Sequence, residues 1–343
     1  METISLTIDG LPVRARKGQT VLEAAQAAGI YIPTLCADPD LRPWGACRIC
    51  IVQIEGARGL PASCTTPATD GMVVRTDTPQ IAKIRRNIVE LLLAEGHDDC
   101  LVCPKNNRCD LQHVAAVVGV RERRFNMRAP SRPWDTSNPF FYRDLNKCIL
   151  CAKCVRVCDE IQGVKAIDII YRGYKATIGT FGDRPLAESN CESCGQCVAK
   201  CPVGALVPYN YEWPSREVRT VCAYCGVGCG IYLGVRGDRI VGARGDERSP
   251  VNRGNLCVKG RFGNDFVNHP ERLVRPLIKK DGEFVEATWE EALDTVAEGL
   301  IRHQGDAFAA IASAKCTNEE NYLIQKFARA VMGSNNVDHC ARL

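Results

Sequence analysis

Cysteine is the residue type that stands out in this chain, because 21 of its 343 residues are cysteines. Most of them lie in five short groups instead of being spread along the sequence. A disulfide framework is one interpretation, but it is typical of small secreted domains, and this chain opens METISLTIDG, without a basic start or an apolar signal stretch. In a reducing compartment, grouped thiols are instead expected to bind metal.

Two of the groups share the spacing C-x2-C-x2-C-x3-C, written CILCAKCVRVC at 148–158 and CESCGQCVAKC at 191–201. This is the run of bacterial ferredoxins, in which the fourth cysteine of each run ligates the other [4Fe–4S] cluster. One cluster is therefore expected on Cys148, Cys151, Cys154 and Cys201. The second is expected on Cys158, Cys191, Cys194 and Cys197. Zinc is disfavoured, because this spacing suits the corner of a cubane and not a closed tetrahedral knuckle.

The first group follows a predicted hairpin and helix. Residues 4–8 alternate between apolar and polar, a turn follows at Asp9-Gly10, and a helix is expected from Thr20 to Gly29. The next four cysteines are Cys36, Cys47, Cys50 and Cys64. Hairpin, helix and cysteine loop together resemble the β-grasp domain that carries a [2Fe–2S] cluster in large iron–sulfur electron-transfer subunits. A structural zinc site is the alternative, although such sites usually pair two C-x2-C knuckles.

The second group follows a predicted core-facing helix at 81–95, whose apolar face consists of Ile81, Ile84, Ile88, Leu91 and Leu92. The sequence HDDCLVCPKNNRC comes next and contains His97, Cys100, Cys103 and Cys109. It resembles the module in which one histidine and three cysteines hold a [4Fe–4S] cluster. The family leaves three residues between the histidine and the first cysteine and this chain has two, so Asp98, Asp99 or water are alternative ligands.

The last group is CAYCGVGC at 222–229 with a distant fourth cysteine. Its spacing resembles the [4Fe–4S] domain that opens the molybdopterin oxidoreductases. The resemblance implies a cluster on Cys222, Cys225, Cys229 and Cys257. It also implies that Lys259 bridges cluster and pterin, with a solvated surface lysine as the alternative. Cys316 and Cys340 are left over and are expected to be partly buried free thiols.

The carboxyl-terminal residues are predicted to form a helix at 287–301, a buried strand at 307–314 and a second helix at 317–333. This order is that of a doubly wound α/β domain as it begins. Residues 313–343 resemble the segment of formate dehydrogenase catalytic subunits that contacts bis-molybdopterin guanine dinucleotide. Together with the cysteine groups, the resemblance covers the whole chain and is closest to the soluble NAD(P)-linked formate dehydrogenases.

The expected fold is therefore an α+β multidomain chain. Its parts, in order, are a β-grasp [2Fe–2S] domain at 1–80, a helical [4Fe–4S] domain with one His and three Cys ligands at 81–137, a 2[4Fe–4S] ferredoxin-like domain at 138–210, a molybdopterin oxidoreductase [4Fe–4S] domain at 217–273, and the first α/β units of a molybdopterin-binding domain at 274–343.

The resemblance implies a cytoplasmic enzyme that interconverts formate and CO2 at molybdenum or tungsten. One [2Fe–2S] and four [4Fe–4S] clusters would pass electrons to a flavin-containing NAD(P)H diaphorase subunit or another electron-transfer subunit. The alternatives are a subunit related to the large subunit of NADH:quinone oxidoreductase, a part of an [FeFe]-hydrogenase, and a zinc-binding module. The net charge of +4 and the absence of an apolar run of about 20 residues predict neither a nucleic-acid partner nor a membrane span.

The sequence stops at Leu343, after the stretch NNVDHCARL. In the resembled family the next residue is the Cys or selenocysteine that ligates the metal, so the molybdenum or tungsten ligand is expected immediately after Leu343 and not within these residues. A selenocysteine codon read as a stop, an engineered end and a real short protein would each give this terminus. We expect these 343 residues to carry electrons without oxidising formate, and residues 274–343 to expose apolar faces.

Overall fold

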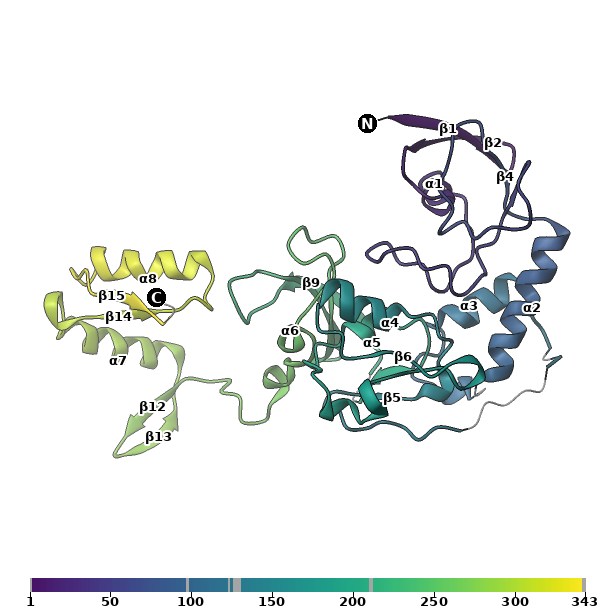
Figure 1. The fold of residues 1–343 in the computed structure, drawn as a ribbon. Helices are drawn as coiled ribbons and strands as arrows, with labels where there is room; N and C mark the ends of the chain where they lie inside the picture. The colour runs from purple at the N-terminus through teal and green to yellow at the C-terminus, as the bar shows by residue number, and fades with distance from the viewer. Residues whose placement is uncertain (1, 97–98, 123, 126–130, 210–211, 341–343) are drawn as a thin grey trace. The chain divides into compact units, whose positions relative to one another are not determined.

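The computed structural model describes residues 2–96, 99–122, 124–125, 131–209 and 212–340. The chain divides into two compact units, 1–211 and 212–343 (Figure 1). Within the described ranges no helix is both long and apolar enough to cross a lipid bilayer.

The first unit begins with a hairpin of β1 (Thr3–Ile8) and β2 (Leu11–Arg16), as predicted. Strand β1 also pairs in parallel with β4 (Val73–Arg75), which pairs with β3 (Gln53–Ile54), so the sheet order is β2-β1-β4-β3. Helix α1 (Val21–Ala27) follows the hairpin and has the predicted capping box of Thr20 and Glu23. The predicted β-grasp elements are therefore confirmed.

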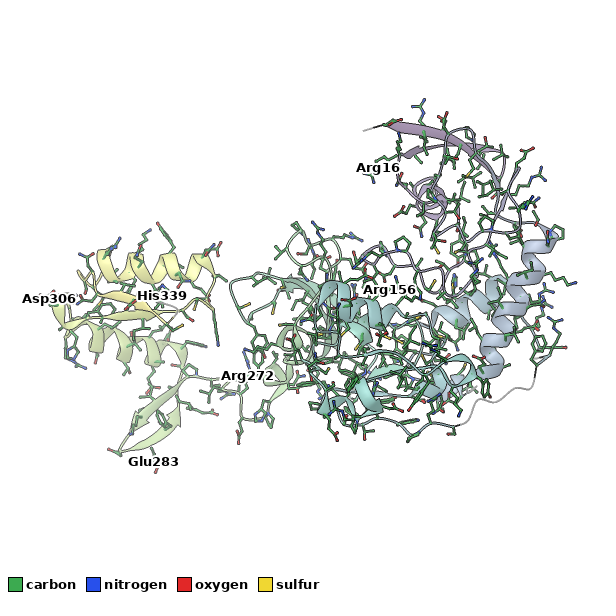
Figure 2. All side chains as sticks on the ribbon, viewed as in Figure 1. Arg16, Arg156, Arg272, Glu283, Asp306 and His339 are labelled. Atoms are coloured by element: carbon green, nitrogen blue, oxygen red, sulfur yellow. The ribbon has the colours of Figure 1, made fainter. Side chains whose placement is uncertain are left out.

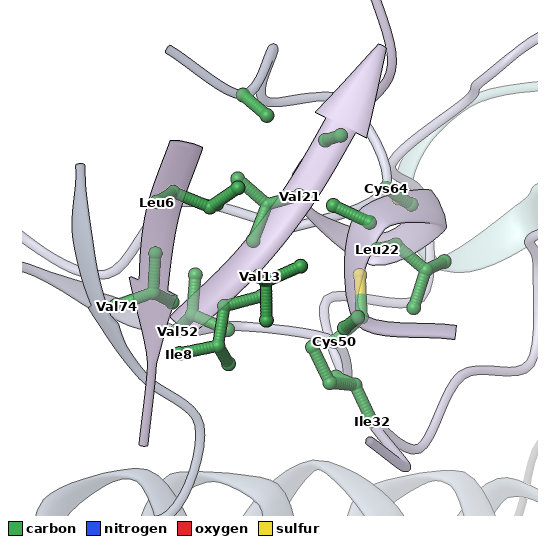
Figure 3. Packing of buried hydrophobic residues seen from close by; sticks show 14 of the residues in the cluster. Leu6, Ile8, Val13, Val21, Leu22, Ile32, Cys50, Val52, Cys64 and Val74 are labelled. Carbon is green, nitrogen blue, oxygen red and sulfur yellow. The ribbon is translucent and has the colours of Figure 1, made fainter. Parts of the chain in front are cut away.

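The core of this domain lies between the sheet and α1 (Figure 3). Alternate side chains of β1 and β2 point into it, among them Leu6, Ile8 and Val13, and α1 contributes Val21 and Leu22. The thiols of Cys50 and Cys64 belong to the same buried cluster. The loop that carries the first cysteine group is thus anchored directly on the hydrophobic core.

Two helices follow, α2 (Pro79–Glu95) and α3 (Asp110–Val117), with a 3-10 turn at Cys100–Val102 between them. The existence of α2 is confirmed, and its predicted face is right for Ile81 but wrong for Leu91. Besides Ile81, the helix buries Arg85, Val89, Glu90 and Ala94, whereas Leu91 is 44% exposed. Arg85 and Glu90 can be buried because each forms a hydrogen bond with a residue of another segment.

The rest of the first unit has little regular structure. Strand β5 (Phe141–Arg143) pairs with β8 (Leu206–Pro208), and β6 (Asp168–Ile170) pairs with β7 (Thr177–Gly179). The two ferredoxin-type runs form the short helices α4 (Lys153–Arg156), which continues into a π-helical turn at Val157–Ile161, and α5 (Gln196–Lys200).

The second unit opens with a three-stranded sheet of β9 (Arg216–Val221), β10 (Gly230–Arg236) and β11 (Arg239–Gly245), followed by the short helix α6 (Val258–Phe262). A hairpin of β12 (Leu277–Lys280) and β13 (Glu283–Glu286) precedes α7 (Trp289–Ile301). Strands β14 (Ala310–Ala312) and β15 (Val337–His339) are parallel and are joined through α8 (Asn318–Ala330). The predicted α/β crossover is confirmed, as are the caps at Thr288 and Thr317.

Many apolar side chains at the carboxyl-terminal end of the second unit are exposed. The sequence predicts a buried strand at 307–314, but Ile311 is 81% exposed. A pair of strands with few neighbouring elements cannot cover both of its faces. Leu293 and Val296 on α7 and Tyr322 and Leu323 on α8 are also exposed, so the prediction that residues 274–343 expose apolar faces is confirmed.

The β-grasp core gives a first prediction. Ile8 is fully buried, so Ile8→Ala should lower the free energy of unfolding of this domain by about 2–5 kcal/mol. Leu11 at the start of the next strand is 57% exposed, and Leu11→Ala should change it by only about 0.5 kcal/mol or less. Amide hydrogen exchange in β1 and β2 measures both. Equal effects of the two variants would contradict the described core.

Candidate metal centres

The first cysteine group is brought together in the loop between α1 and β4. The Cys36 thiol accepts hydrogen bonds from the thiols of Cys47 and Cys64, which lowers the pKa of Cys36 to about 2 and raises the pKa of both donors. The backbone N–H of Cys47 also points at Cys36 Sγ, at 3.5 Å. The hydrogen bond from Cys64 lowers the pKa of Cys50 to about 6. The four sulfur atoms thus form one connected set.

Two buried arginines hold this loop from outside the β-grasp domain. Arg85 of α2 donates from Nε to Ile49 O and from Nη2 to Ile51 O, both at 2.9 Å, on either side of Cys50. Arg156 of α4, labelled in Figure 2, donates from Nη1 to Arg42 O at 2.6 Å and from Nη2 to Cys36 O. The carbonyl groups beside two of the four cysteines are therefore fixed by cations from the following two domains.

Ion pairs and a further hydrogen bond also join the loop of the first cysteine group to the ferredoxin-like domain. Lys200 Nζ at the end of α5 lies 2.8 Å from Asp38 Oδ1 and 2.7 Å from Asp40 Oδ2. The N–H of Arg42 donates to Glu160 Oε2 at 2.8 Å. The loop of the first cysteine group is thus docked on the ferredoxin-like domain.

The second group is described only in part, because His97 and Asp98 lie outside the described residues. Cys100, Cys103 and Cys109 lie near one another: burial raises the pKa of Cys109, and the charges of the other two thiols act in the same direction. Asp99, one alternative ligand, is paired with Lys147 at 2.9 Å.

Gly204 explains how this group approaches the ferredoxin-like domain. A Cβ atom at Gly204 would lie 2.5 Å from Cys103 Sγ, which is closer than any side chain permits. Asp110 N donates to Pro202 O at 2.8 Å, and Lys105 Nζ donates to Cys201 O at 3.3 Å. The second group therefore lies directly against the segment that begins with Cys201.

The two ferredoxin-type runs surround two separate spaces. Ferredoxin site I is the space lined by Cys148, Cys151, Cys154 and Cys201, and it has an empty volume of about 440 Å³ including its opening to solvent. Ferredoxin site II is lined by Cys158, Cys191, Cys194 and Cys197, with about 460 Å³ measured in the same way. Each space therefore holds three thiols of one run and the fourth thiol of the other run.

The backbone of the two runs has the same unusual conformation at matching positions. Leu150 and Ser193 both have positive φ, and each donates its N–H to the sulfur two residues earlier, at 3.4 Å. Ala152 and Gly195 also have positive φ and precede α4 and α5. Positive φ is costly for Leu and Ala, so its presence here indicates a local functional constraint.

Thiols of ferredoxin site I are deeply buried. Burial raises the pKa of Cys148 to about 12 and that of Cys151 to about 11, and it raises the pKa of Cys154 well above its ordinary value. A thiol in such surroundings stays protonated unless a bound metal supplies the compensating charge. The donor set therefore fits a metal cluster that is ligated by four thiolates.

Three cysteines of the last group lie between β9 and β10, and the fourth, Cys257, directly precedes α6. Burial raises the pKa of Cys229, and the charges of Cys222, Cys225 and Cys257 reinforce the shift, so the four thiols are neighbours. A Cβ atom at Gly260 would lie 3.4 Å from Cys222 Sγ. Lys259, on α6 two residues after Cys257, is exposed.

The remaining cysteines are exposed, so the prediction that they are partly buried is wrong. Cys316 lies before α8, and Cys340 Sγ is 3.5 Å from Ser313 Oγ, a contact that lowers the pKa of Cys340. Within the described ranges, no group of three or more His, Cys, Asp or Glu side chains is arranged to hold a single metal ion.

The position expected for the molybdenum or tungsten ligand is not tested by the structure. Leu343, immediately after which that ligand is expected, lies outside the described residues, which end at Cys340. The expected ligand itself follows the last residue of the sequence. Its place beyond Leu343 therefore stays a prediction.

Sequence reasoning missed the buried arginines Arg85, Arg143 and Arg156. Arg143 could have been suspected, because it shares one face of a short strand with the apolar Phe141 two residues earlier. Arg85 and Arg156 carry no such signal, since their partners are backbone carbonyls of a distant segment.

Five family models match consecutive stretches of the chain. They are the 2Fe-2S iron-sulfur cluster binding domain at 1–79, the NADH-ubiquinone oxidoreductase-G iron-sulfur binding region at 85–124, the ferredoxin-like domain of NADH-quinone oxidoreductase subunit 3 at 138–207, the molybdopterin oxidoreductase Fe4S4 domain at 215–269, and molybdopterin oxidoreductase at 272–343. Their types and order confirm the predicted fold class.

Known relatives are similar over almost the whole chain. The G 2 subunit of NADH-quinone oxidoreductase from Rhizobium meliloti is 40% identical over 99% of this chain and 40% of its own length. The alpha subunit of NADPH-Fe(3+) oxidoreductase of Geobacter sulfurreducens is equally similar. A Staphylococcus haemolyticus protein provisionally named formate dehydrogenase is 30% identical, over 99% of this chain and 39% of its own length. The chain thus spans about 40% of the length of these curated relatives.

A solved structure is similar as well. A chain of an NAD+-reducing [NiFe]-hydrogenase, crystallised in the H2-reduced state, aligns with a TM-score of 0.56 at 34% identity, covering 62% of this chain and 90% of that chain. Fold and thiol groups define an iron–sulfur electron-transfer protein that continues into a molybdopterin oxidoreductase portion. The chain belongs to the family of molybdopterin oxidoreductases with iron–sulfur domains that resembles the G subunits of NADH-quinone oxidoreductase.

The crossed arrangement of thiols gives a second prediction. Cys201→Ser should alter the low-temperature paramagnetic signal of ferredoxin site I, although Cys201 belongs to the other run. Cys158→Ser should alter the signal of ferredoxin site II instead. Cys316→Ser, at an exposed thiol outside both sites, is the matched control and should alter neither. A change in site II caused by Cys201→Ser, with site I intact, would contradict crossed ligation.

The docked loop gives a third prediction. Arg156→Met removes charged hydrogen bonds to the carbonyl groups of Arg42 and Cys36 and should lower the free energy that holds the first cysteine loop by about 1.5–3 kcal/mol. The measurement is the temperature at which the chain loses the iron of that loop. Arg42→Met is the control, because the Arg42 side chain is 81% exposed and should contribute about 0.5 kcal/mol or less. Equal losses in both variants would refute a special role for Arg156.

Proposed function

We propose that the chain holds one [2Fe–2S] and four [4Fe–4S] clusters and conducts electrons between a nicotinamide-dependent partner subunit and a molybdopterin centre. The ligands would be the five groups named from the sequence. The observation that carries the proposal is the pair of spaces at ferredoxin sites I and II, each lined by four thiols. When bound, the clusters supply one-electron centres whose potentials the protein adjusts.

The neighbourhood of the sites supports conduction. Besides burial, the charge of Cys36 raises the pKa of Cys151 in ferredoxin site I, and the charge of Cys197 in ferredoxin site II raises the pKa of Cys154. Cys103 lies against Gly204, three residues after Cys201. Ferredoxin site I therefore adjoins the first cysteine group, the second cysteine group and ferredoxin site II. The buried arginines and Gly204 keep the distances between these sites short.

The nicotinamide-dependent partner is proposed from the relatives. NADH-quinone, NADPH-Fe(3+) and NAD+-reducing activities stand in the names of the three proteins described above. Because each name denotes a subunit or a multi-subunit enzyme, we infer that the nucleotide is handled by a separate subunit. In the family resemblance this is a flavin-containing diaphorase.

Formate is the second candidate substrate. It is favoured by the resemblance of residues 313–343 to formate dehydrogenase catalytic subunits. Strand β15 lies in that segment, and α/β domains bind their ligands at the carboxyl ends of such parallel strands. The relatives named as formate dehydrogenases support it at 30% identity. The protein ligand of the metal would follow Leu343, and exposed Lys259 remains our candidate for the bridge between cluster and pterin.

A fourth prediction tests both the cluster content and the electron transfer from a nicotinamide-dependent partner. The native complex, isolated without oxygen through a tag on this chain, should contain about 18 iron atoms per copy of the chain, with matching acid-labile sulfide. NADH or NADPH should bleach its visible absorption, because electrons enter the clusters. Formate should do the same only if the second candidate is correct. Zinc in place of iron would refute the cluster assignment, and intact clusters that neither nucleotide reduces would refute the nicotinamide link.

A further inference from the structure

Arg143 is a buried cation in the wall between ferredoxin sites I and II. Its side chain is only 6% exposed, and it lines both spaces. Ile167 and Leu206 are the other residues that line both, and each is buried and apolar. Among the described residues shared by the two sites, the guanidinium is therefore the only charged group.

The backbone fixes the position of this side chain. Arg143 ends β5 opposite Leu206 of β8. It also exchanges two backbone hydrogen bonds with Asp135, at 2.9 and 3.0 Å. Paired on both sides, the residue cannot turn away from the wall without breaking the local sheet.

The guanidinium of Arg143 has hydrogen-bond acceptors for only two of its three nitrogen atoms. Nε and Nη2 donate to Asp135 Oδ2 at 2.9 and 2.6 Å. Nη1 is buried and has no hydrogen-bond partner within the described part of the chain. A buried donor of this kind is costly unless it meets an acceptor.

Asp135 is itself held firmly. Its carboxylate accepts from Ser137 N and Leu186 N, both at 3.0 Å. Burial acts to raise the pKa of Asp135, but hydrogen bonds from Ser137 and Arg143 outweigh it and lower the pKa to about 2. The carboxylate is therefore ionised, and it aims the guanidinium.

We propose that Arg143 Nη1 donates a hydrogen bond to the cluster of ferredoxin site II and that the Asp135–Arg143 pair sets the reduction potential of that cluster. The inference rests on the proposed function, since it requires a cluster at this site. Site II is chosen because Phe141 of the same strand and Leu186, whose N–H donates to the same Asp135 oxygen as the guanidinium, line that space and not site I. Reduction adds negative charge, so a nearby cation and donor stabilise the reduced form, whereas Asp135 opposes them.

The test uses the full chain with its clusters and three variants. Arg143→Met removes charge and donor and should shift the reduction equilibrium of site II about tenfold toward the oxidised form, about 59 mV for one electron. Arg143→Lys keeps the charge and should shift it less in the same direction. Asp135→Asn leaves the cation without its counter-charge and should shift it the opposite way. Redox titration followed by low-temperature paramagnetic resonance measures each potential, and Cys197→Ser identifies the site II signal.

The control is Arg132→Met, whose arginine acts on Cys148 of ferredoxin site I and should leave the site II potential unchanged. Iron and sulfide content separate the two hypotheses. A wild-type chain that cannot hold the clusters refutes the proposed function. Loaded variants refute the inference if their site II potentials equal that of the wild type, or if the Asp135 and Arg143 variants shift in the same direction, as a packing defect would produce. If Arg143→Met does not fold, Arg143→Lys and Asp135→Asn decide by the same criterion.

Discussion

The burial of thiols is the constraint on which the first unit depends. Burial raises the pKa of Cys148, Cys151 and Cys154 in ferredoxin site I and of Cys191 in ferredoxin site II, so these thiols stay neutral unless bound metal compensates their charge. The segments that carry them form only short helices and short strand pairings, which bury little apolar surface of their own. Metal ligation is therefore also part of the folding free energy of this region.

Buried arginines are the second consequence of the same constraint. Arg85, Arg143 and Arg156 are each buried, and each points at backbone carbonyls or a carboxylate beside a cysteine loop. Burying a cation is unfavourable in an apolar core, but it is tolerated where partners are fixed and negative charge accumulates nearby. Clusters bound by thiolates would supply such charge. The arginines thus connect three domains around their redox sites and keep the sites close, which electron transfer requires.

Local chemistry made much of this structure predictable. The hairpin, the capping boxes of α1 and α8 and the grouping of cysteines depend on residues a few positions apart, and the structure reproduces them. The predicted face of α2 is wrong in part, because Arg85 donates to Ile49 O and Glu90 pairs with Arg124, each more than thirty residues away. The prediction of a buried β14 fails for a related reason, since burial depends on which elements cover a strand and not on its composition.

The two ferredoxin-type runs show how far spacing determines geometry. Their intervening residues differ: Ile149 and Leu150 in one run stand where Glu192 and Ser193 stand in the other. Nevertheless Leu150 and Ser193 adopt nearly the same φ, 51° and 56°, and donate to the same relative sulfur. Glycine occupies the next left-handed position in the second run and alanine does so in the first, at a cost of about 1–2 kcal/mol for a residue with a Cβ atom. A conformation that persists despite this difference is imposed by the sulfur atoms, because the N–H groups can reach them only when the backbone turns this way.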